Sequence, residues 1–97
     1  MRKIIAGYPV EWDEDKDKLN WKKHGIRFET TALVFADPHH IEYPDEMHSD
    51  EEERYIALGM VNNLLFVVCK DREETTRIIS ARRANAKERR LYNGNRA

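Results

Sequence analysis

The stretch RYIALGMVNNLLFVVCK, residues 54–70, decides the fold because it reads as two strands that meet at a tight corner. Residues 54–61 and 64–70 are rich in β-branched, aromatic and other apolar side chains, a composition that favours strands. The Asn62-Asn63 pair between them tolerates positive φ and therefore suits a two-residue hairpin turn. The two strands are expected to lie antiparallel, side by side, at the centre of a sheet.

Further strands are expected on both sides of this hairpin. Thr75–Arg83 follows a polar loop and is rich in β-branched residues, so it extends the same sheet. Residues 8–13 and 39–43 predict two shorter strands upstream, and the stretch 44–53 between strands reads as an acidic loop. Because successive strands are linked by short loops, the sequence predicts a small antiparallel sheet.

Three helices are expected around the sheet. The first has Asp13 as N-cap, runs to about Lys23 and stops at Gly25, which takes the left-handed conformation. A second, about Glu29 to Ala36, is ended by Asp37-Pro38. The buried side of the first helix would be a narrow stripe made of Trp12, Lys16, Leu19 and Lys23.

The last helix opens with the capping box Asn85-Ala86-Lys87-Glu88 and runs to about Tyr92. The predicted order is therefore β-α-α-β-β-β-β-α, an α+β fold with the helices packed on one face of the sheet. We expect a single domain over residues 1–97, with 1–8 and 94–97 frayed.

Charge is distributed unevenly along the 97 residues although the net charge is only −1. Residues 1–53 hold 7 Lys/Arg and 14 Asp/Glu, a balance of −7, whereas residues 54–97 hold 10 and 4, a balance of +6. This asymmetry points to a polyanion or a partner of opposite charge. The alternative is that the two halves of the chain pair with each other.

Cysteine usage and hydropathy suggest a cytoplasmic protein. The one cysteine, Cys69, rules out an internal disulfide and lies in an apolar run, so it is expected as a core strand residue. The basic start of the chain lacks the apolar stretch of a secretory signal. No run approaches the ~20 apolar residues of a membrane span.

Arginines in the strand 75–83 are the strongest candidates for chemistry. Arginine presents a planar fork that matches phosphate oxygens. Regular alternation would place Arg77 and Arg83 on one face and Arg82 on the other. Either a bulge or strand end turns Arg82 and Arg83 toward one cleft, or one of them serves a partner. A surface network with the acidic loop is the other interpretation.

Neighbouring residues could complete a site. Glu53-Arg54-Tyr55 could supply a base, a phosphate clamp and a stacking or proton-donating group. His48 lies among carboxylates that favour its charged form, so it could donate a proton or be a surface histidine without a role. Basic side chains of the last helix could contact an RNA backbone or form a solvated face: Lys87, Arg89 and Arg90. The histidine spacings fit no zinc pattern, and neither a metal nor a cofactor is expected.

Seven ordered stretches of the chain resemble the BrnT family of toxins: EWDEDK at 11–16, KHGI at 23–26, FE at 28–29, VFADP at 34–38, HSDEEERY at 48–55, RIISARRA at 77–84 and ERRLY at 88–92. The resemblance implies a compact fold similar to RelE-type toxins and an endoribonuclease, a hydrolase-type toxin that inhibits translation and growth. Its motifs place the family's activity on Lys23, Glu53, Arg54, Arg82 and Arg83. Arg77, from its position in the arginine-rich strand, is a further candidate for RNA contact.

The resemblance also implies a partner. BrnT toxins pair with BrnA, a ribbon-helix-helix antitoxin, so we expect a complex in which the antitoxin neutralises the toxin. A heterotetramer is one possible form of this complex. It would bind operator DNA only through the antitoxin. Many relatives have a serine cap before Phe28, whereas Arg27 stands here, which should cost about 1 kcal/mol unless another group substitutes. The alternative function is a non-catalytic module that binds nucleic acid or protein through the basic C-terminal half.

Overall fold

The computed structural model describes residues 1–47 and 53–96, and its centre is a six-stranded sheet in the order β1-β2-β6-β5-β4-β3. The strands are β1 (Arg2–Ile5), β2 (Tyr8–Glu11), β3 (Ile41–Pro44), β4 (Arg54–Val61), β5 (Asn63–Arg72) and β6 (Thr75–Arg83). All neighbours are antiparallel except β2 and β6, which run parallel. The prediction of a purely antiparallel sheet is therefore wrong at one pair, and the strand β1 lies within the segment 1–8 that was expected to fray.

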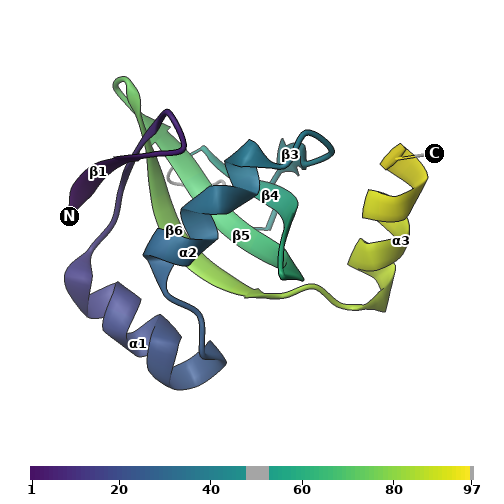
Figure 1. Ribbon diagram of the computed structural model, residues 1–97, viewed down its shortest axis with the longest axis horizontal. Helices are drawn as coiled ribbons and strands as arrows, with labels where there is room; N and C mark the ends of the chain where they lie inside the picture. Colours follow the sequence, from purple (N-terminus) through teal and green to yellow (C-terminus); the bar gives the residue numbers. More distant parts are fainter. Residues whose placement is uncertain (48–52, 97) are drawn as a thin grey trace.

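Helices cover both faces of the sheet, so the prediction that they share one face is wrong. On one face lie α1 (Glu14–His24), α2 (Phe28–Thr31) and the 3₁₀ helix η1 (Ala32–Ala36), and on the other lies α3 (Ala86–Arg96) (Figure 1). We call these the α1 face and the α3 face. The α+β class itself is confirmed. No helix in the described part of the chain is both long enough and apolar enough to cross a membrane.

Alternate residues of the central strands build a core on each face. On the α1 face, Trp12 and Phe28 pack with strand residues such as Val67. On the α3 face, the buried Tyr92 packs with Ile56 and with other strand residues. This second core explains why α3 leaves the other helices: its aromatic residue needs an apolar surface, and the α1 face is already occupied.

The first helix has the predicted ends but not the predicted inner side. Asp13 accepts hydrogen bonds from the amides of residues 15 and 16, and Gly25 ends the helix at φ 69°. Leu19, expected inside, is 63% exposed, whereas Asp17 and Asn20 are buried. Hydrophobic periodicity fails here because the helix is docked by polar side chains that satisfy backbone groups.

Those two polar side chains connect three elements. Asn20 donates to the carbonyl of Ile26 at 2.9 Å and accepts from the amide of Ala81 in β6 at 3.1 Å. Asp17 accepts from the amide of Phe28 at 2.8 Å and pairs with Arg27. Asp17 thus satisfies the first amide of α2, whose N-cap residue Arg27 makes no side-chain cap hydrogen bond.

The β4–β5 corner is tighter than predicted. The ladder pairs Val61 with Asn63, so only Asn62, at φ 62°, stands outside it. Three residues before Asn62, Gly59 lies under η1, where a Cβ would come within 2.9 Å of the Val34 carbonyl oxygen. Glycine is needed there because η1 approaches the sheet backbone itself.

Candidate functional site

A bulge in β6 decides which arginines share a face. The ladder pairs Val68 with Ser80 but Cys69 with Ile78, which leaves Ile79 as an extra residue. Ile78 and Ala81 consequently both enter the core on the α1 face. The shift by one residue reverses the alternation between the two halves of the strand.

With this bulge, Arg77 and Arg82 both lie on the α3 face. Arg82 pairs across the ladder with Phe66, which belongs to the core of that face. Arg77 precedes the inward-facing Ile78 and therefore points the opposite way, toward the α3 face. Regular alternation was expected to place Arg77 and Arg82 on opposite faces, and this expectation is wrong because Ile79 is an extra residue in β6. Arg83 is the arginine that lies on the α1 face.

A line of charged side chains crosses the α3 face from strand to strand. Successive partners in the ladders of β1, β2, β6, β5 and β4 are Arg2, Glu11, Arg77, Lys70 and Arg54. We call these five residues the cationic row. Residues directly opposite each other in a sheet point to the same side, and strands lie ~4.8 Å apart, so the row extends roughly 19 Å. It carries four positive charges and one negative charge.

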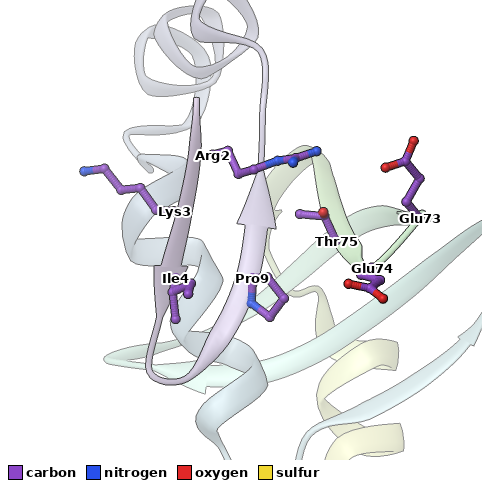
Figure 2. Close-up of a pocket in the computed structure, with 7 residues that line it drawn as sticks. All are labelled: Arg2, Lys3, Ile4, Pro9, Glu73, Glu74 and Thr75. Carbon is purple, nitrogen blue, oxygen red and sulfur yellow. The ribbon is translucent and has the colours of Figure 1, made fainter.

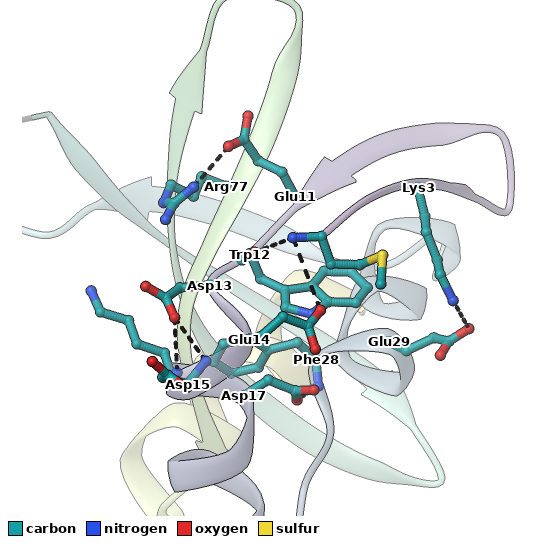
Figure 3. A network of polar contacts seen from close by, with 12 residues as sticks. Lys3, Glu11, Trp12, Asp13, Glu14, Asp15, Asp17, Phe28, Glu29 and Arg77 are labelled. Carbon is teal, nitrogen blue, oxygen red and sulfur yellow. Dashed lines mark hydrogen bonds and ion pairs between the residues drawn. The ribbon is translucent and has the colours of Figure 1, made fainter.

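Glu11 organises one end of the row. Its carboxylate is buried and accepts from Arg77 at 2.8 Å (Figure 3). It also accepts from Arg2 at 3.4 Å and lies 3.6 Å from Arg72. Burial alone would raise the pKa of Glu11, but the hydrogen bonds from Arg77 and Arg2 and the charge of Arg72 hold it below its ordinary value. Glu11 is therefore an anion at neutral pH that fixes three guanidinium groups.

Arg82 is held between the sheet and α3. Its guanidinium carbon lies 3.8 Å from the centre of the Phe66 ring, a cation–π contact. Its two terminal nitrogens each donate to Glu88 at 2.9 Å, and one also donates to the carbonyl of Arg83. Three of its five N–H groups are engaged in this way.

Glu88 has a second task at the start of α3. It accepts from the amide of Asn85 at 2.8 Å, while Asn85 accepts from the amide of Glu88 at 2.9 Å, so the predicted capping box is present. Burial would raise the pKa of Glu88, but the hydrogen bonds from Arg82 and Asn85 lower it. The helix end and the arginine are thus joined through one carboxylate.

A groove of about 850 Å³ separates α3 from β3–β5. Tyr43, Ile56 and Phe66 line its floor, and Lys87, Arg90 and other residues of α3 line its wall. The groove combines aromatic surface with the cations Lys87 and Arg90 next to Arg82, the two properties with which proteins hold single-stranded nucleic acid. Three carboxylates also line it: Asp45, Glu46 and Glu88.

A smaller hollow of about 430 Å³ lies at the start of β4, lined by Glu53, Arg54 and Tyr55 among others. Glu53 is exposed and directly precedes the strand. Tyr55 points to the α1 face and donates to Asp71 at 3.1 Å. Burial raises the pKa of Tyr55, so its hydroxyl stays protonated. Arg54 points the other way, into the cationic row.

The remaining candidates are spread over the surface. Lys23 is exposed in the last turn of α1, and Arg83 pairs across the ladder with Leu65 of the α1-face core, so neither joins the α3 face. Lys87, Arg89 and Arg90 are exposed on α3. His48 lies outside the described residues. The structure thus places Arg54, Arg77 and Arg82 on one face, with Arg82 opposite Phe66 and the other two in the row that crosses Lys70.

Sequence reasoning missed Glu11, Lys70, Arg72 and Arg2. No spacing could have revealed them, because they become neighbours only through the register of separate strands. Cys69 is buried as predicted, and burial raises the pKa of its thiol. Among residues 1–47 and 53–96, no group of three His, Cys, Asp or Glu side chains is arranged to hold a metal ion.

Fold and site together define a small α+β domain whose open sheet face presents arginines beside a C-terminal helix. Residues 12–88 match the family model described as "Ribonuclease toxin, BrnT, of type II toxin-antitoxin system". The chain therefore belongs to the BrnT family, the ribonuclease toxins of type II toxin–antitoxin systems, and the resemblance seen in its sequence is confirmed. Membership implies an antitoxin partner.

A solved structure agrees with this assignment. The crystal structure of the Brucella abortus ribonuclease toxin BrnT matches with a TM-score of 0.63 and 26% sequence identity, over 78% of this chain and 95% of that one. No curated protein sequence matches the chain.

Proposed function

We propose that this chain is a metal-independent endoribonuclease that binds RNA on the α3 face and cuts it to stop translation and growth. The observation that carries the proposal is the placement of Arg54, Arg77 and Arg82 on one open face in a ribonuclease toxin family. Guanidinium groups fixed before the reaction stabilise the charge that develops on phosphate oxygens. That role needs no metal ion.

The proposed reaction is transfer of the RNA chain to its own 2′-hydroxyl. A base takes the 2′-hydroxyl proton, the 2′-oxygen bonds to the adjacent phosphorus, and the bond from phosphorus to the 5′-oxygen breaks as an acid protonates that oxygen. Products are a 2′,3′-cyclic phosphate and a free 5′-hydroxyl. Arg54 and Arg82 would bind the non-bridging oxygens, and Glu53 and His48 are the candidates for base and acid.

The other sequence candidates enter with different roles. Lys87, Arg89 and Arg90 on α3 would bind flanking phosphates, two of them from the wall of the groove. The roles of Lys23 and Arg83 in cleavage rest on the family resemblance, and RNA would have to pass round the end of β6 to reach them. Arg77, two strands from Arg54, would hold a phosphate farther along the RNA from the scissile one.

Cleavage of RNA in excess chelator tests the chemistry. The purified protein should cut RNA with EDTA present and leave cyclic phosphate ends. Arg54→Ala and Arg82→Ala should each reduce the rate by at least tenfold. Lys18→Ala is the matched control, because it removes one exposed positive charge from α1. Activity lost in EDTA would overturn metal independence, and full activity in both arginine variants would overturn the site.

The partner belongs to the same proposal. We infer that a BrnA-like antitoxin neutralises the toxin in the cytoplasm and that the complex reaches operator DNA through the antitoxin. Expression of this chain alone should arrest growth, and co-expression of the adjacent reading frame should relieve the arrest. Absence of arrest together with salt-sensitive binding would support the non-catalytic module instead.

A further inference from the structure

We propose that Arg2, Arg72 and Arg77, gathered around Glu11, form a second phosphate-binding subsite that holds single-stranded RNA away from the scissile bond. The inference rests on the proposed function, because the RNA held here is the substrate of that site. The subsite spans the neighbouring strands β1, β2 and β6 and the end of β5, on the side of the cationic row away from Arg54.

The charge balance of the cluster favours an anion. Three guanidinium groups surround one carboxylate, which leaves two positive charges in excess. Glu11 is only 9% exposed, whereas the side chains of Arg2 and Arg72 are 65% and 58% exposed. The carboxylate is therefore a buried support, and the outer arginines keep N–H groups directed to solvent.

The orientation of Arg2 agrees with this role. Its side chain extends across β2 toward Thr75, while that of Lys3 points the opposite way (Figure 2). Lys3 pairs with Glu29 of α2 on the α1 face. Arg2 is thus presented on the same face as the remainder of the row.

Two carboxylates limit the subsite on one side. Glu73 and Glu74, in the turn between β5 and β6, line a hollow of about 610 Å³ together with Arg2. Within the described part of the chain neither forms an ion pair with an arginine. A phosphate chain would be repelled from this turn and directed along the row toward Lys70 and Arg54.

The row fits an extended single strand better than a protein partner. The sheet itself spaces the row at ~4.8 Å per strand over roughly 19 Å, with Glu11 between the cations Arg2 and Arg77. A nucleic-acid backbone is a line of evenly spaced single negative charges, and proteins track it with a positive surface. The competing occupant would be an acidic segment of a protein partner, whose binding does not require that an oligonucleotide binds.

Binding of 2′-O-methyl oligonucleotides tests the subsite, because they lack the hydroxyl that attacks and cannot be cut by the proposed reaction. The full chain should bind a probe of about twelve nucleotides more tightly than one of about three. In the double variant Arg2→Ala/Arg72→Ala, the ratio of the affinity for the long probe to that for the short probe should fall by at least tenfold. The slope of log affinity against log salt should also fall by ~1.4, at ~0.7 per contact for single strands.

Controls separate the possible failures. Lys18→Ala should leave the affinity for the long probe and the salt slope as in the parent chain, and circular dichroism checks that the double variant folds. Unchanged affinity in a folded double variant would overturn the subsite, as would a loss confined to antitoxin binding. If the parent chain binds as described but cuts no RNA, the proposed function fails while the subsite stands.

Discussion

The hydroxyl of Tyr92 in α3 donates a hydrogen bond to the Oδ2 atom of Asp37, 55 positions earlier at the end of η1. The same carboxylate accepts from the amides of Met60, at 2.8 Å, and His39, at 2.9 Å. Asp37 thus joins the helices of the α1 face, the end of β4 and the last helix. Together with the Arg82–Glu88 pair, it gives α3 one polar attachment in its first turn and one near its middle.

Loss of the Tyr92 hydroxyl should loosen α3 without removing its ring from the core. Tyr92→Phe is expected to lower the free energy of unfolding by about 1–3 kcal/mol, because a hydrogen bond to a charged group is lost. Urea unfolding measures the loss, and hydrogen exchange should show faster exchange in α3. Tyr43→Phe is the control, since that hydroxyl makes no hydrogen bond with described residues. Equal effects of the two changes would contradict the role of Asp37.

Release of Arg82 from Glu88 should strengthen RNA binding on the α3 face. In Glu88→Gln the amide oxygen can still accept from Asn85 and keep the cap, but the charge that competes with phosphate is gone. We expect affinity for a 2′-O-methyl oligonucleotide to rise by about threefold to tenfold, ~0.6–1.4 kcal/mol. Glu46→Gln, a charge removal in the same groove, should have a smaller effect. Weaker binding in Glu88→Gln would mean that the ion pair positions Arg82 for RNA.

Local features of the fold could be predicted from the sequence because neighbouring residues determine them. Asp13 and Gly25 mark the ends of α1 through their own hydrogen bonding and conformation, and Asn85 with Glu88 marks the start of α3. The inner side of α1 could not be predicted, because Asp17 is buried through bonds to a distant segment. Hydrophobic periodicity contains no information about such bonds.

The site depended on longer-range geometry. Arg54, Arg77 and Arg82 were identified from residue type and family motifs, but strict alternation put Arg77 and Arg82 on opposite faces. One extra residue, Ile79, reverses that result, and nothing in the local pattern indicates where a strand will bulge. The role of Glu11 could not be predicted for a related reason, because its arginine partners come from three separate strands.

Addition of one methyl group at Gly59 should test how closely η1 packs on the sheet. The new Cβ would meet the Val34 Cβ at 2.7 Å and its carbonyl oxygen at 2.9 Å, and the backbone of η1 cannot move without disturbing Asp37. Gly59→Ala should therefore cost about 1–3 kcal/mol in unfolding free energy. Gly94→Ala, in α3 with open space around it, should be neutral or stabilising by up to about 1 kcal/mol. Equal stabilities of the two variants in urea would refute the close approach.

Acid should destabilise the fold through carboxylates that are held as anions. The folded-state pKa of Glu11 lies below its ordinary value of 4.5, and those of Asp37 and Glu88 are lowered as well. A group with a lowered folded pKa contributes stability above its unfolded pKa and loses it as the pH falls through the folded value. The urea concentration at the midpoint of unfolding should therefore stay constant from pH 7 to about 5 and decrease below about pH 4.5.

The variant Glu11→Gln measures how much of the stability lost in acid comes from the ion pairs between Glu11 and its arginines. At pH 7 the variant should be less stable than the parent chain by about 1.5–3 kcal/mol, because its amide accepts charged hydrogen bonds less strongly. The difference should narrow as the parent Glu11 becomes protonated, so the two pH curves converge at low pH. Glu74→Gln, at an exposed turn position, should follow the parent curve throughout. A constant gap between the Glu11→Gln and parent curves down to pH 3 would show that Glu11 stabilises the sheet by packing and not as an anion.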